Sequence, residues 1–372
     1  MTTPNRYVRN GQLHSYIKYG FMVNADDFFF SLQQICAQAG PLSWATVRVG
    51  AEDIALAAAP VALHQRLLRP LSHLQQPSAS ATTLTLTLVT AAADAPPFPW
   101  PDAPQAGDFW EFRTGDYLFS HYGHGLAVVG LDLRRGCAVG YVRRPELLPA
   151  AFFSGLLFTT LYQALRPRGF FLLHAAALAW QGQGVLITGP SGAGKTTTML
   201  QCVRAGFRFV SDDATLLTRA AQGDILAVAT LNTMHVTPRT VDFFPELAPF
   251  VNERADNGKA TIFLPEVYPH SMSAVNSREA VAPVRLLIVP SLQGPRDGTF
   301  EPLSGRTVLS EALPLSVDLQ QPAAAAAHLD LLAQLVKQAR CFRLHLPPDV
   351  VSVPPLLAAR LAHLSLDVTK VR

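Results

Sequence analysis

The chain has 372 residues, which is long enough for two domains with separate hydrophobic cores. Charged residues make up only 15% of it, against about 25% in an average soluble protein, and the net charge of +3 is spread without a basic block. This charge pattern argues against nucleic-acid binding. The four cysteines are isolated and form no CxxC pair, which argues against a zinc site or a disulfide scaffold. They are more typical of thiols in a reducing, cytoplasmic compartment.

Residues 1–145 predict a β-rich α+β domain without a catalytic constellation. The first twenty residues lack the apolar core of a signal peptide, and the Ala- and Pro-rich stretch 91–106 predicts a loop. His121 and His124 share a hairpin but have no third metal ligand, so we expect turn residues there. Strand-like segments separated by GHG and RRG turns predict a meander. These segments are residues 43–49, 83–90, 116–122, 126–133 and 137–142. A substrate-holding or assembly role is expected.

Residues 147–165 carry no charge and are about as long as a membrane span. They contain several polar residues, however, and Arg166 follows at once. We therefore predict a buried core helix with Pro149 near its first turn, and no membrane partner.

The second predicted domain, residues 146–372, contains a hairpin. Residues 170–180 (FFLLHAAALAW) predict one apolar strand, QGQG a turn, and residues 185–188 the returning strand. His174 lies within the first strand. Taken alone, a single histidine in an apolar run is more often a core residue than a functional one.

A phosphate-binding loop follows this hairpin directly. Residues 189–196 satisfy G-x-x-x-x-G-K-[ST] between a predicted strand and a helix over 196–204, which is the context that the pattern requires. The glycines allow backbone N–H groups to surround phosphate oxygens at the positive end of the helix dipole. Lysine is scarce, with five in the chain, so a background match is improbable. The predicted nucleotide-binding residues are Gly189, Pro190, Ser191, Gly192, Ala193, Gly194, Lys195, Thr196 and Thr197.

Two adjacent carboxylates follow the next predicted strand, residues 207–210. Asp212 and Asp213 stand where a kinase needs a Mg²⁺ ligand and a group that accepts the proton of an attacking hydroxyl. The alternative is a solvated turn into the strand predicted at 214–218. We favour a catalytic and metal-binding role for the two aspartates, because they follow the phosphate loop within one strand–helix–strand unit.

His174, GPSGAGKT and VSDD together resemble the core of the HPr kinase/phosphorylase family, whose catalytic domain is related to phosphoenolpyruvate carboxykinase. The spacings agree, with 21 residues from His174 to Lys195 and 18 from Lys195 to Asp213. The resemblance implies ATP and Mg²⁺ as cofactors, Asp213 as the general base for a seryl hydroxyl, His174 beside the reaction centre, and Thr196 with Asp212 as metal ligands. It replaces the core interpretation of His174. It also implies a protein or peptide substrate and is compatible with a homo-oligomer.

The later segments look like a branch of HPr kinase-like proteins associated with peptide natural-product gene clusters, through residues 257–269, 284–294 and 341–349. The parent family's Mg²⁺-binding glutamate and its arginine segment for phosphorolysis have no counterpart that we could locate, so phosphorolysis and HPr as acceptor are not expected. Among Arg239, Arg254 and Lys259, the last is the best candidate for a cation near the triphosphate. Helices are predicted at 322–339 and 354–366 as packing elements.

Three functions remain open from the sequence. The first is an ATP-dependent kinase that transfers the γ-phosphoryl group to a serine-like hydroxyl of a protein or peptide, including a natural-product precursor. The second is a small-molecule kinase, although those chains usually place the phosphate loop at the start. The third is a nucleotide-binding protein or ATPase, although the LSGGQ-type signature of transporter ATPases is absent from the sequence.

Overall fold

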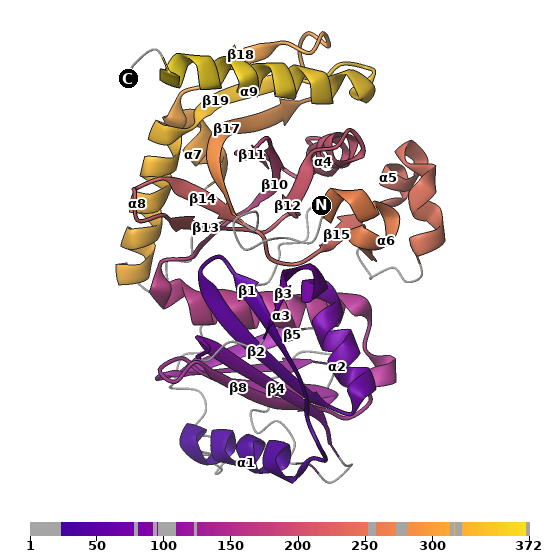
Figure 1. Ribbon diagram of the computed structural model, residues 1–372, viewed down its shortest axis with the longest axis vertical. Helices are drawn as coiled ribbons and strands as arrows, with labels where there is room; N and C mark the ends of the chain where they lie inside the picture. The colour runs from indigo at the N-terminus through magenta and orange to yellow at the C-terminus, as the bar shows by residue number, and fades with distance from the viewer. Residues whose placement is uncertain are drawn as a thin grey trace, which may run out of the picture. The chain divides into compact units, whose positions relative to one another are not determined.

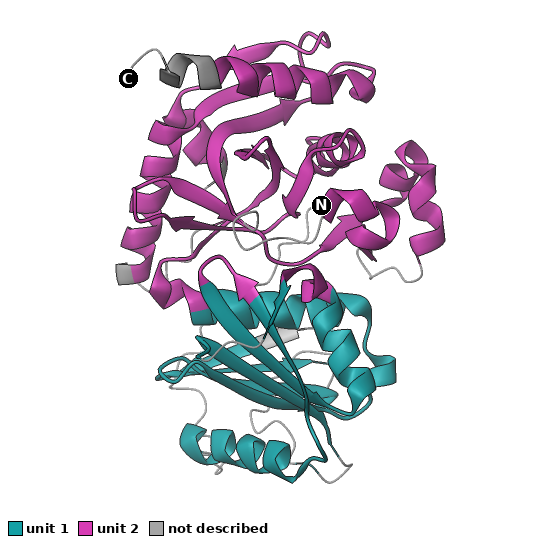
Figure 2. Cartoon of the chain, viewed as in Figure 1, with its two compact units in different colours: residues 1–47, 52–69, 75–164 teal, residues 48–51, 70–74, 165–372 magenta. Residues whose placement is uncertain are grey.

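The computed structural model describes residues 24–77, 81–91, 95, 109–122, 125–251, 258–272, 281–312, 316 and 322–369 (Figure 1). The chain divides into two compact units (Figure 2). Unit 1 comprises Met1–Val47, Glu52–Arg69 and Gln75–Ala164, and unit 2 comprises Arg48–Ala51, Pro70–Leu74 and Leu165–Arg372. The domain boundary predicted between residues 145 and 146 precedes the last helix of unit 1, and it stays a prediction.

Unit 1 is built on one eight-stranded sheet in the order β3-β1-β2-β4-β8-β7-β6-β5. All five predicted strands are present, and β6, β7 and β8 form the predicted antiparallel meander. The pairs β2–β4 and β4–β8 are parallel, which the sequence did not predict. Its strands are β1 Ser43–Val49, β2 Glu52–Ala59, β3 Gln75–Gln76, β4 Leu84–Thr90, β5 Phe109–Thr114, β6 Tyr117–Tyr122, β7 Ala127–Asp132 and β8 Cys137–Val142. His121 lies buried in β6, whereas His124 and most of the predicted loop 91–106 lie outside the described residues.

Helices cover both faces of this sheet (Figure 1). α1 (Ala25–Gln38) places Phe28, Phe29 and Leu32 against one face, and α2 (Val61–Leu68) and α3 (Ala150–Leu165) lie on the other. The predicted uncharged helix is thus confirmed as α3, whose buried residues include Leu157 and Leu161. Within the described parts of the chain, no helix combines the length and apolarity that crossing a bilayer requires.

Unit 2 contains a nine-stranded mixed sheet in the order β12-β10-β11-β17-β14-β13-β9, with β19 added beside β17 and β18 beside β19. β11 and β19 run parallel to β17, the long central strand. A separate pair, β15–β16, is antiparallel. The strands are β9 Phe171–Leu173, β10 Ala175–Trp180, β11 Gln183–Thr188, β12 Arg208–Ser211, β13 Thr215–Arg219, β14 Ile225–Val228, β15 Thr233–Val236, β16 Ala260–Phe263, β17 Val281–Ser291, β18 Phe300–Pro302 and β19 Arg340–His345.

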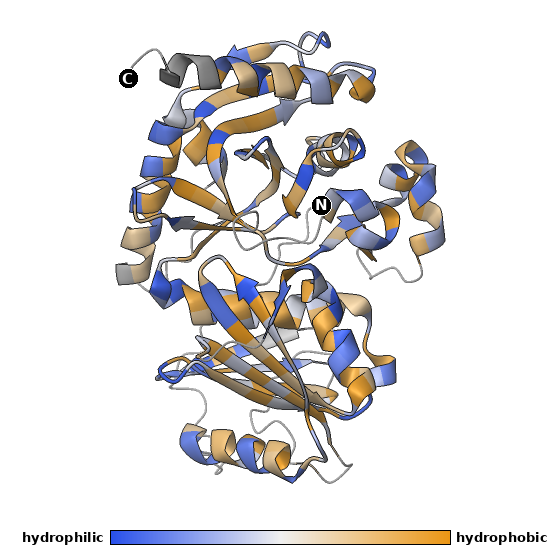
Figure 3. Cartoon of the chain, in the orientation of Figure 1, coloured by the Kyte–Doolittle hydropathy of each residue, from blue (hydrophilic) through white to orange (hydrophobic). Residues whose placement is uncertain are grey.

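Helices pack on this sheet through apolar faces, and the strands themselves carry mainly hydrophobic residues (Figure 3). Leu286 and Ile288 of β17 share one core with Met199 of α4 and Leu357 of α9. The helices are α4 Lys195–Arg204, α5 Pro238–Phe243, α6 Leu264–Val267, α7 Gly305–Ala312, α8 Pro322–Gln338 and α9 Val353–Thr369. The two predicted C-terminal helices are therefore confirmed as α8 and α9. Short 3-10 helices are η2 Arg69–Leu74, η4 Pro145–Leu147, η5 Arg166–Arg168, η6 Pro245–Phe250, η7 Pro269–Met272 and η9 Val350–Ser352.

The single strand predicted over 170–180 is wrong in one respect, because it is broken at His174 into β9 and β10. β9 pairs with β13, whereas β10 pairs with β11 and β12. A continuous apolar run cannot reveal this break, because each half satisfies the same hydrophobic pattern. His174 thus lies where the chain passes from β9, at one edge of the sheet, to β10, next to the strand at the other edge.

His73 in η2 provides a pH-dependent contribution to stability. Both of its ring nitrogens are buried, and neither has a hydrogen-bond partner among the described residues, although the side chain as a whole is partly exposed. Burial lowers the pKa of His73 from 6.5 to about 3. Below pH 6.5 the unfolded chain therefore binds a proton at His73 that the folded chain does not bind. The contribution of His73 to the free energy of unfolding is thus present above pH 6.5 and decreases as the pH falls toward 3.

Because of this histidine, we expect the free energy of unfolding to decrease by about 2 kcal/mol between pH 7.5 and pH 5. Urea unfolding of wild type and His73→Leu at both pH values measures the difference. The variant is expected to lose less stability on acidification than wild type, and the exposed His363→Leu serves as control. An equal loss in wild type and His73→Leu would contradict the assignment.

Candidate active site

The loop between β11 and α4 has the backbone of an anion-binding loop. Gly189, Gly192 and Gly194 have φ angles of 130°, 82° and 100°, which L-residues with side chains rarely adopt. A Cβ on Gly194 would lie 2.7 Å from Cδ1 of Leu346. The left-handed conformation therefore favours glycine at this position, and any side chain would also displace the end of the Leu346 side chain. The loop leads directly into the ten-residue helix α4, whose N-terminus favours negative charge.

Lys195, the first residue of α4, is held over this loop. Its Nζ donates to the carbonyl oxygens of Gly189 (2.7 Å) and Pro190 (3.2 Å), and the side chain is buried. Burial lowers the pKa of Lys195, and the carboxylates of Asp213 and Asp212 oppose this effect by raising it. The ammonium group is therefore poised at the loop, where phosphate oxygens can replace the two carbonyl partners.

His174 and Asp213, far apart in sequence, are brought together. Nε2 of His174 lies 3.3 Å from Oδ1 of Asp213, with side-chain exposures of 25% and 35%. His174 comes from the break between β9 and β10, and Asp213 from the connection between β12 and β13. Asp213 adopts φ +61°, a strained backbone conformation for a residue other than glycine and one that clusters at functional sites.

The pKa of His174 is lowered, first by burial, and further by Lys195 and Lys259, while Asp213 raises it. Since the net direction is downward from 6.5, the imidazole is neutral at pH 7 and can donate one N–H to Asp213. This arrangement orients a partly exposed carboxylate beside the phosphate loop. Such a group can accept a proton from a hydroxyl bound in front of it.

Asp212 has a different partner from that of Asp213. Its Oδ2 accepts a hydrogen bond of 3.0 Å from the backbone N–H of His235 in β15. Burial raises the pKa of Asp212 to about 7, the neighbouring Asp213 adds to the rise, and the His235 hydrogen bond, Lys259 and Lys195 oppose it. A carboxylate with this pKa would be stabilised by a bound cation.

The donor set suits Mg²⁺, which prefers oxygen ligands and usually takes only one or two from the protein when phosphates supply others. Asp212 offers its carboxylate, and Thr196 and Thr197 lie half-buried in the first turn of α4. In the described residues no group of three or more His, Cys, Asp or Glu side chains forms a stand-alone metal site. These residues therefore fit a nucleotide-linked cation.

The three candidate cations differ in position. Lys259 lies close enough for its charge to lower the pKa values of His174, Lys195 and Asp212. Arg239 instead stacks over the ring of Phe243, 5.9 Å from its centroid. Arg254 lies outside the described residues. Lys259 is therefore the candidate that the structure brings to the site.

His235 belongs to the site although the sequence did not single it out. Besides the backbone hydrogen bond to Asp212, its ring Nδ1 lies 3.2 Å from Oγ1 of Thr261, and the charge of Asp213 acts on its pKa. Its segment, TMHV, is an ordinary strand pattern 22 residues beyond Asp213. No local signal in the sequence distinguishes it.

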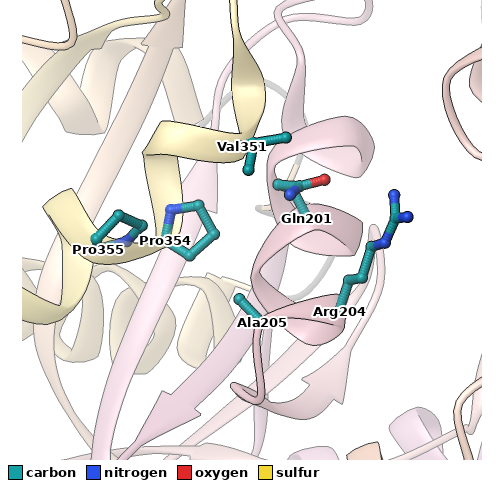
Figure 4. A pocket seen from close by; sticks show the side chains of 6 residues that line it. All are labelled: Gln201, Arg204, Ala205, Val351, Pro354 and Pro355. Atoms are coloured by element: carbon teal, nitrogen blue, oxygen red, sulfur yellow. The ribbon is translucent and has the colours of Figure 1, made fainter.

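A shallow cavity of about 350 Å³ lies at the other end of α4 (Figure 4). It is lined by Gln201, Arg204, Ala205, Val351, Pro354 and Pro355. The phosphate loop precedes the first residue of α4, whereas this cavity adjoins the last ones. It is therefore separate from the phosphate-binding end.

The four cysteines are free thiols, and Cys36, Cys202 and Cys341 are buried. Cys137 is partly exposed. None contributes to the site described above.

Fold and site together define an α/β phosphate-loop protein with a histidine–carboxylate pair. A family model described as "SynChlorMet cassette protein ScmC" matches residues 154–243. An HPr kinase/phosphorylase of Clostridium beijerinckii is 39% identical over 71 residues, 19% of this chain and 22% of that protein. One of Limosilactobacillus reuteri is 47% identical over 53 residues, 14% of this chain and 16% of that protein.

These matches make one segment of the chain similar to HPr kinase/phosphorylases, and that segment spans about a fifth or less of the curated relatives' length. The HPr(Ser) kinase/phosphatase structure from Coxiella burnetii aligns with a TM-score of 0.29 and 14% identity, covering 53% of this chain and 98% of that one. The predicted resemblance is confirmed by the curated relatives, and the mixed α/β fold class is confirmed by the sheets and helices of the chain itself. The activity of those relatives is a matter for proposal in this chain.

Proposed function

We propose that this protein is an ATP-dependent phosphotransferase that moves the γ-phosphoryl group to a serine-like hydroxyl of a protein or peptide. The observation that carries the proposal is the 3.3 Å contact between His174 and Asp213, in a site whose charges also act on Lys195 of the phosphate loop. A nucleotide-binding protein without transfer chemistry has no need of an oriented, partly exposed carboxylate at that place.

In the proposed reaction, Asp213 takes the hydroxyl proton while the hydroxyl oxygen forms a bond to the γ-phosphorus. The bond from that phosphorus to the β–γ bridging oxygen breaks, and ADP leaves. His174 keeps the Asp213 carboxylate oriented through Nε2. Lys195 and Lys259 stabilise the negative charge on the phosphates, and the loop N–H groups fix their position.

Mg²⁺, when bound, would neutralise the phosphate oxygens, and Asp212 with Thr196 are its proposed protein ligands. His235 donates its backbone N–H to Asp212 and so holds that carboxylate in place. This division of roles leaves Asp213 available as the base, while its neighbour binds the cation.

The acceptor is proposed from the relatives. The curated matches are HPr kinase/phosphorylases, so HPr is one acceptor to test. The family model describes a cassette protein, which supports testing a peptide natural-product precursor as well. Small-molecule hydroxyls form a third set to test.

The test is phosphoryl transfer from γ-¹⁸O-labelled ATP to HPr, to a library of serine peptides and to small alcohols, followed by mass spectrometry. We expect one acceptor class to gain a labelled phosphate. ADP and free phosphate formed at the same rate with and without every acceptor would instead support the ATPase alternative. Omitting Mg²⁺ and adding EDTA is the matched control.

A further inference from the structure

Two connections lie side by side at the break in the sheet. β9 pairs antiparallel with β13, matching Leu173 with Thr215, and β10 pairs antiparallel with β12, matching Ala177 with Ser211. Leu173 and Ala177 are four residues apart, as are Ser211 and Thr215, so these two matched pairs share one register, which shifts by one residue between Ala177 and Leu178. Between them the ladder is interrupted, and this is where His174 and Asp213 lie.

Side-chain hydroxyls bind backbone groups at this interruption. Oγ1 of Thr215 donates to the carbonyl of Ala175 (2.8 Å) and lies 2.5 Å from Oγ of Ser211. Oγ1 of Thr188 donates to the carbonyl of His174 (2.9 Å). Oγ of Ser316 accepts from the N–H of His174 (2.9 Å).

All four hydroxyl residues are buried, with exposures of 1% for Thr188 and Ser211, 0% for Thr215 and 6% for Ser316. A buried backbone group without a partner is costly, so these hydrogen bonds define where the His174–Ala175 segment can lie. Thr188 is also the residue before Gly189, so it joins the phosphate loop to the backbone of His174.

We propose that these four hydroxyls, with Thr215 as the central one, are positioning residues that hold His174 and Asp213 at their contact distance. Thr215 and Ser211 bracket the connection that carries Asp213 and tie it to the backbone beside His174. Thr188 and Ser316 fix that backbone from its other side. None of the four contacts the proposed reacting atoms, so they act through His174 and Asp213.

The geometry of Asp213 makes this support necessary. Its left-handed backbone conformation is unfavourable for an isolated aspartate and persists only when its surroundings fix it. Within the turn, the N–H of Ala214 donates to the carbonyl of Asp212 at 2.6 Å. The hydroxyl pair at the ends of the turn supplies the remaining constraint.

The expected effect on the rate of phosphoryl transfer rests on the proposed function. The test variant is Thr215→Val, which removes the hydroxyl but keeps the β-branched shape. We expect phosphoryl transfer to fall about 10- to 100-fold, because misplacement by about 1 Å is enough for such losses. The Kd for MgATP, measured with a fluorescent nucleotide, is expected to stay within about two-fold of wild type. Thr215→Ser should restore most of the rate, and Thr218→Val on the same strand should change neither quantity.

The position of the histidine gives a readout that is independent of turnover. In ¹⁵N-histidine spectra, with His174 assigned through His174→Gln, its ring signal is expected to shift in Thr215→Val and not in Thr218→Val. An unshifted signal together with an unchanged rate would overturn the proposal. If wild type transfers phosphate to no acceptor, the proposed function fails while the spectra still decide the positioning role.

Should Thr215→Val not fold, Thr188→Val tests the same set. It is expected to shift the His174 signal and to lower the transfer rate in the same way. A wild-type spectrum and rate in folded Thr188→Val would then overturn the proposal.

Discussion

Asp213→Asn is expected to lower the rate of phosphoryl transfer about 10²- to 10⁴-fold, because it removes the group that accepts the hydroxyl proton. Asparagine is the best substitution for this test. It tolerates the left-handed backbone that Asp213 adopts, so the turn and its hydrogen bonds should survive. Transfer is measured by mass spectrometry of the acceptor under saturating MgATP.

Binding of nucleotide separates a lost base from a lost fold. The Kd of Asp213→Asn for MgATP is expected to remain within about three-fold of wild type, since the loop and Lys195 are unchanged. Asp330→Asn is the matched control, because it removes an exposed carboxylate that pairs with Arg219 and Gln334. If Asp213→Asn transfers phosphate as fast as Asp330→Asn, Asp213 is not the base.

Lys195→Met is expected to weaken binding of ATP about 10- to 100-fold, because charge-assisted hydrogen bonds to the phosphates contribute about 1.5–3 kcal/mol. Methionine has a similar shape and avoids burying a charge, so the free protein should not lose stability through this change. Calorimetric titration with ATP measures the effect.

AMP supplies the internal comparison for this variant. It lacks the β- and γ-phosphates that Lys195 is proposed to contact, so its affinity should be nearly the same in wild type and Lys195→Met. Lys337→Met, at an exposed position of α8, should bind both nucleotides as wild type does. Equal weakening of ATP and AMP would mean that the lysine supports the loop rather than the outer phosphates.

Much of the nucleotide-binding segment follows from contiguous residues. The hairpin turn, the glycine loop, the helix after it and the strand before Asp212 were all predicted, and β11, α4 and β12 lie at those places. Such elements are encoded by local pattern, since hydrophobic period and turn chemistry act over a few residues. The family resemblance used the same short segment.

Elements without a strong local pattern were missed. β2 has the sequence EDIALAAA, in which alanine does not favour a strand, and it forms because both of its neighbours pair with it. α1, which begins at the Asn24 cap, was also overlooked, although Asn24 followed by two acidic residues is a helix-start signal.

By itself, the sequence determined the phosphate loop, the two acidic residues and the spacing that links them to His174, because each lies within one short, strongly patterned stretch. Only the tertiary structure decided that the apolar strand breaks at His174 and that Asp213 meets it at 3.3 Å. It also decided that the hydroxyls of Thr188, Thr215 and Ser316 bind the backbone at the break and that His235 binds Asp212. The physical reason is that strand pairing between distant segments sets these contacts, and a buried backbone group takes whichever hydroxyl or amide the fold brings to it.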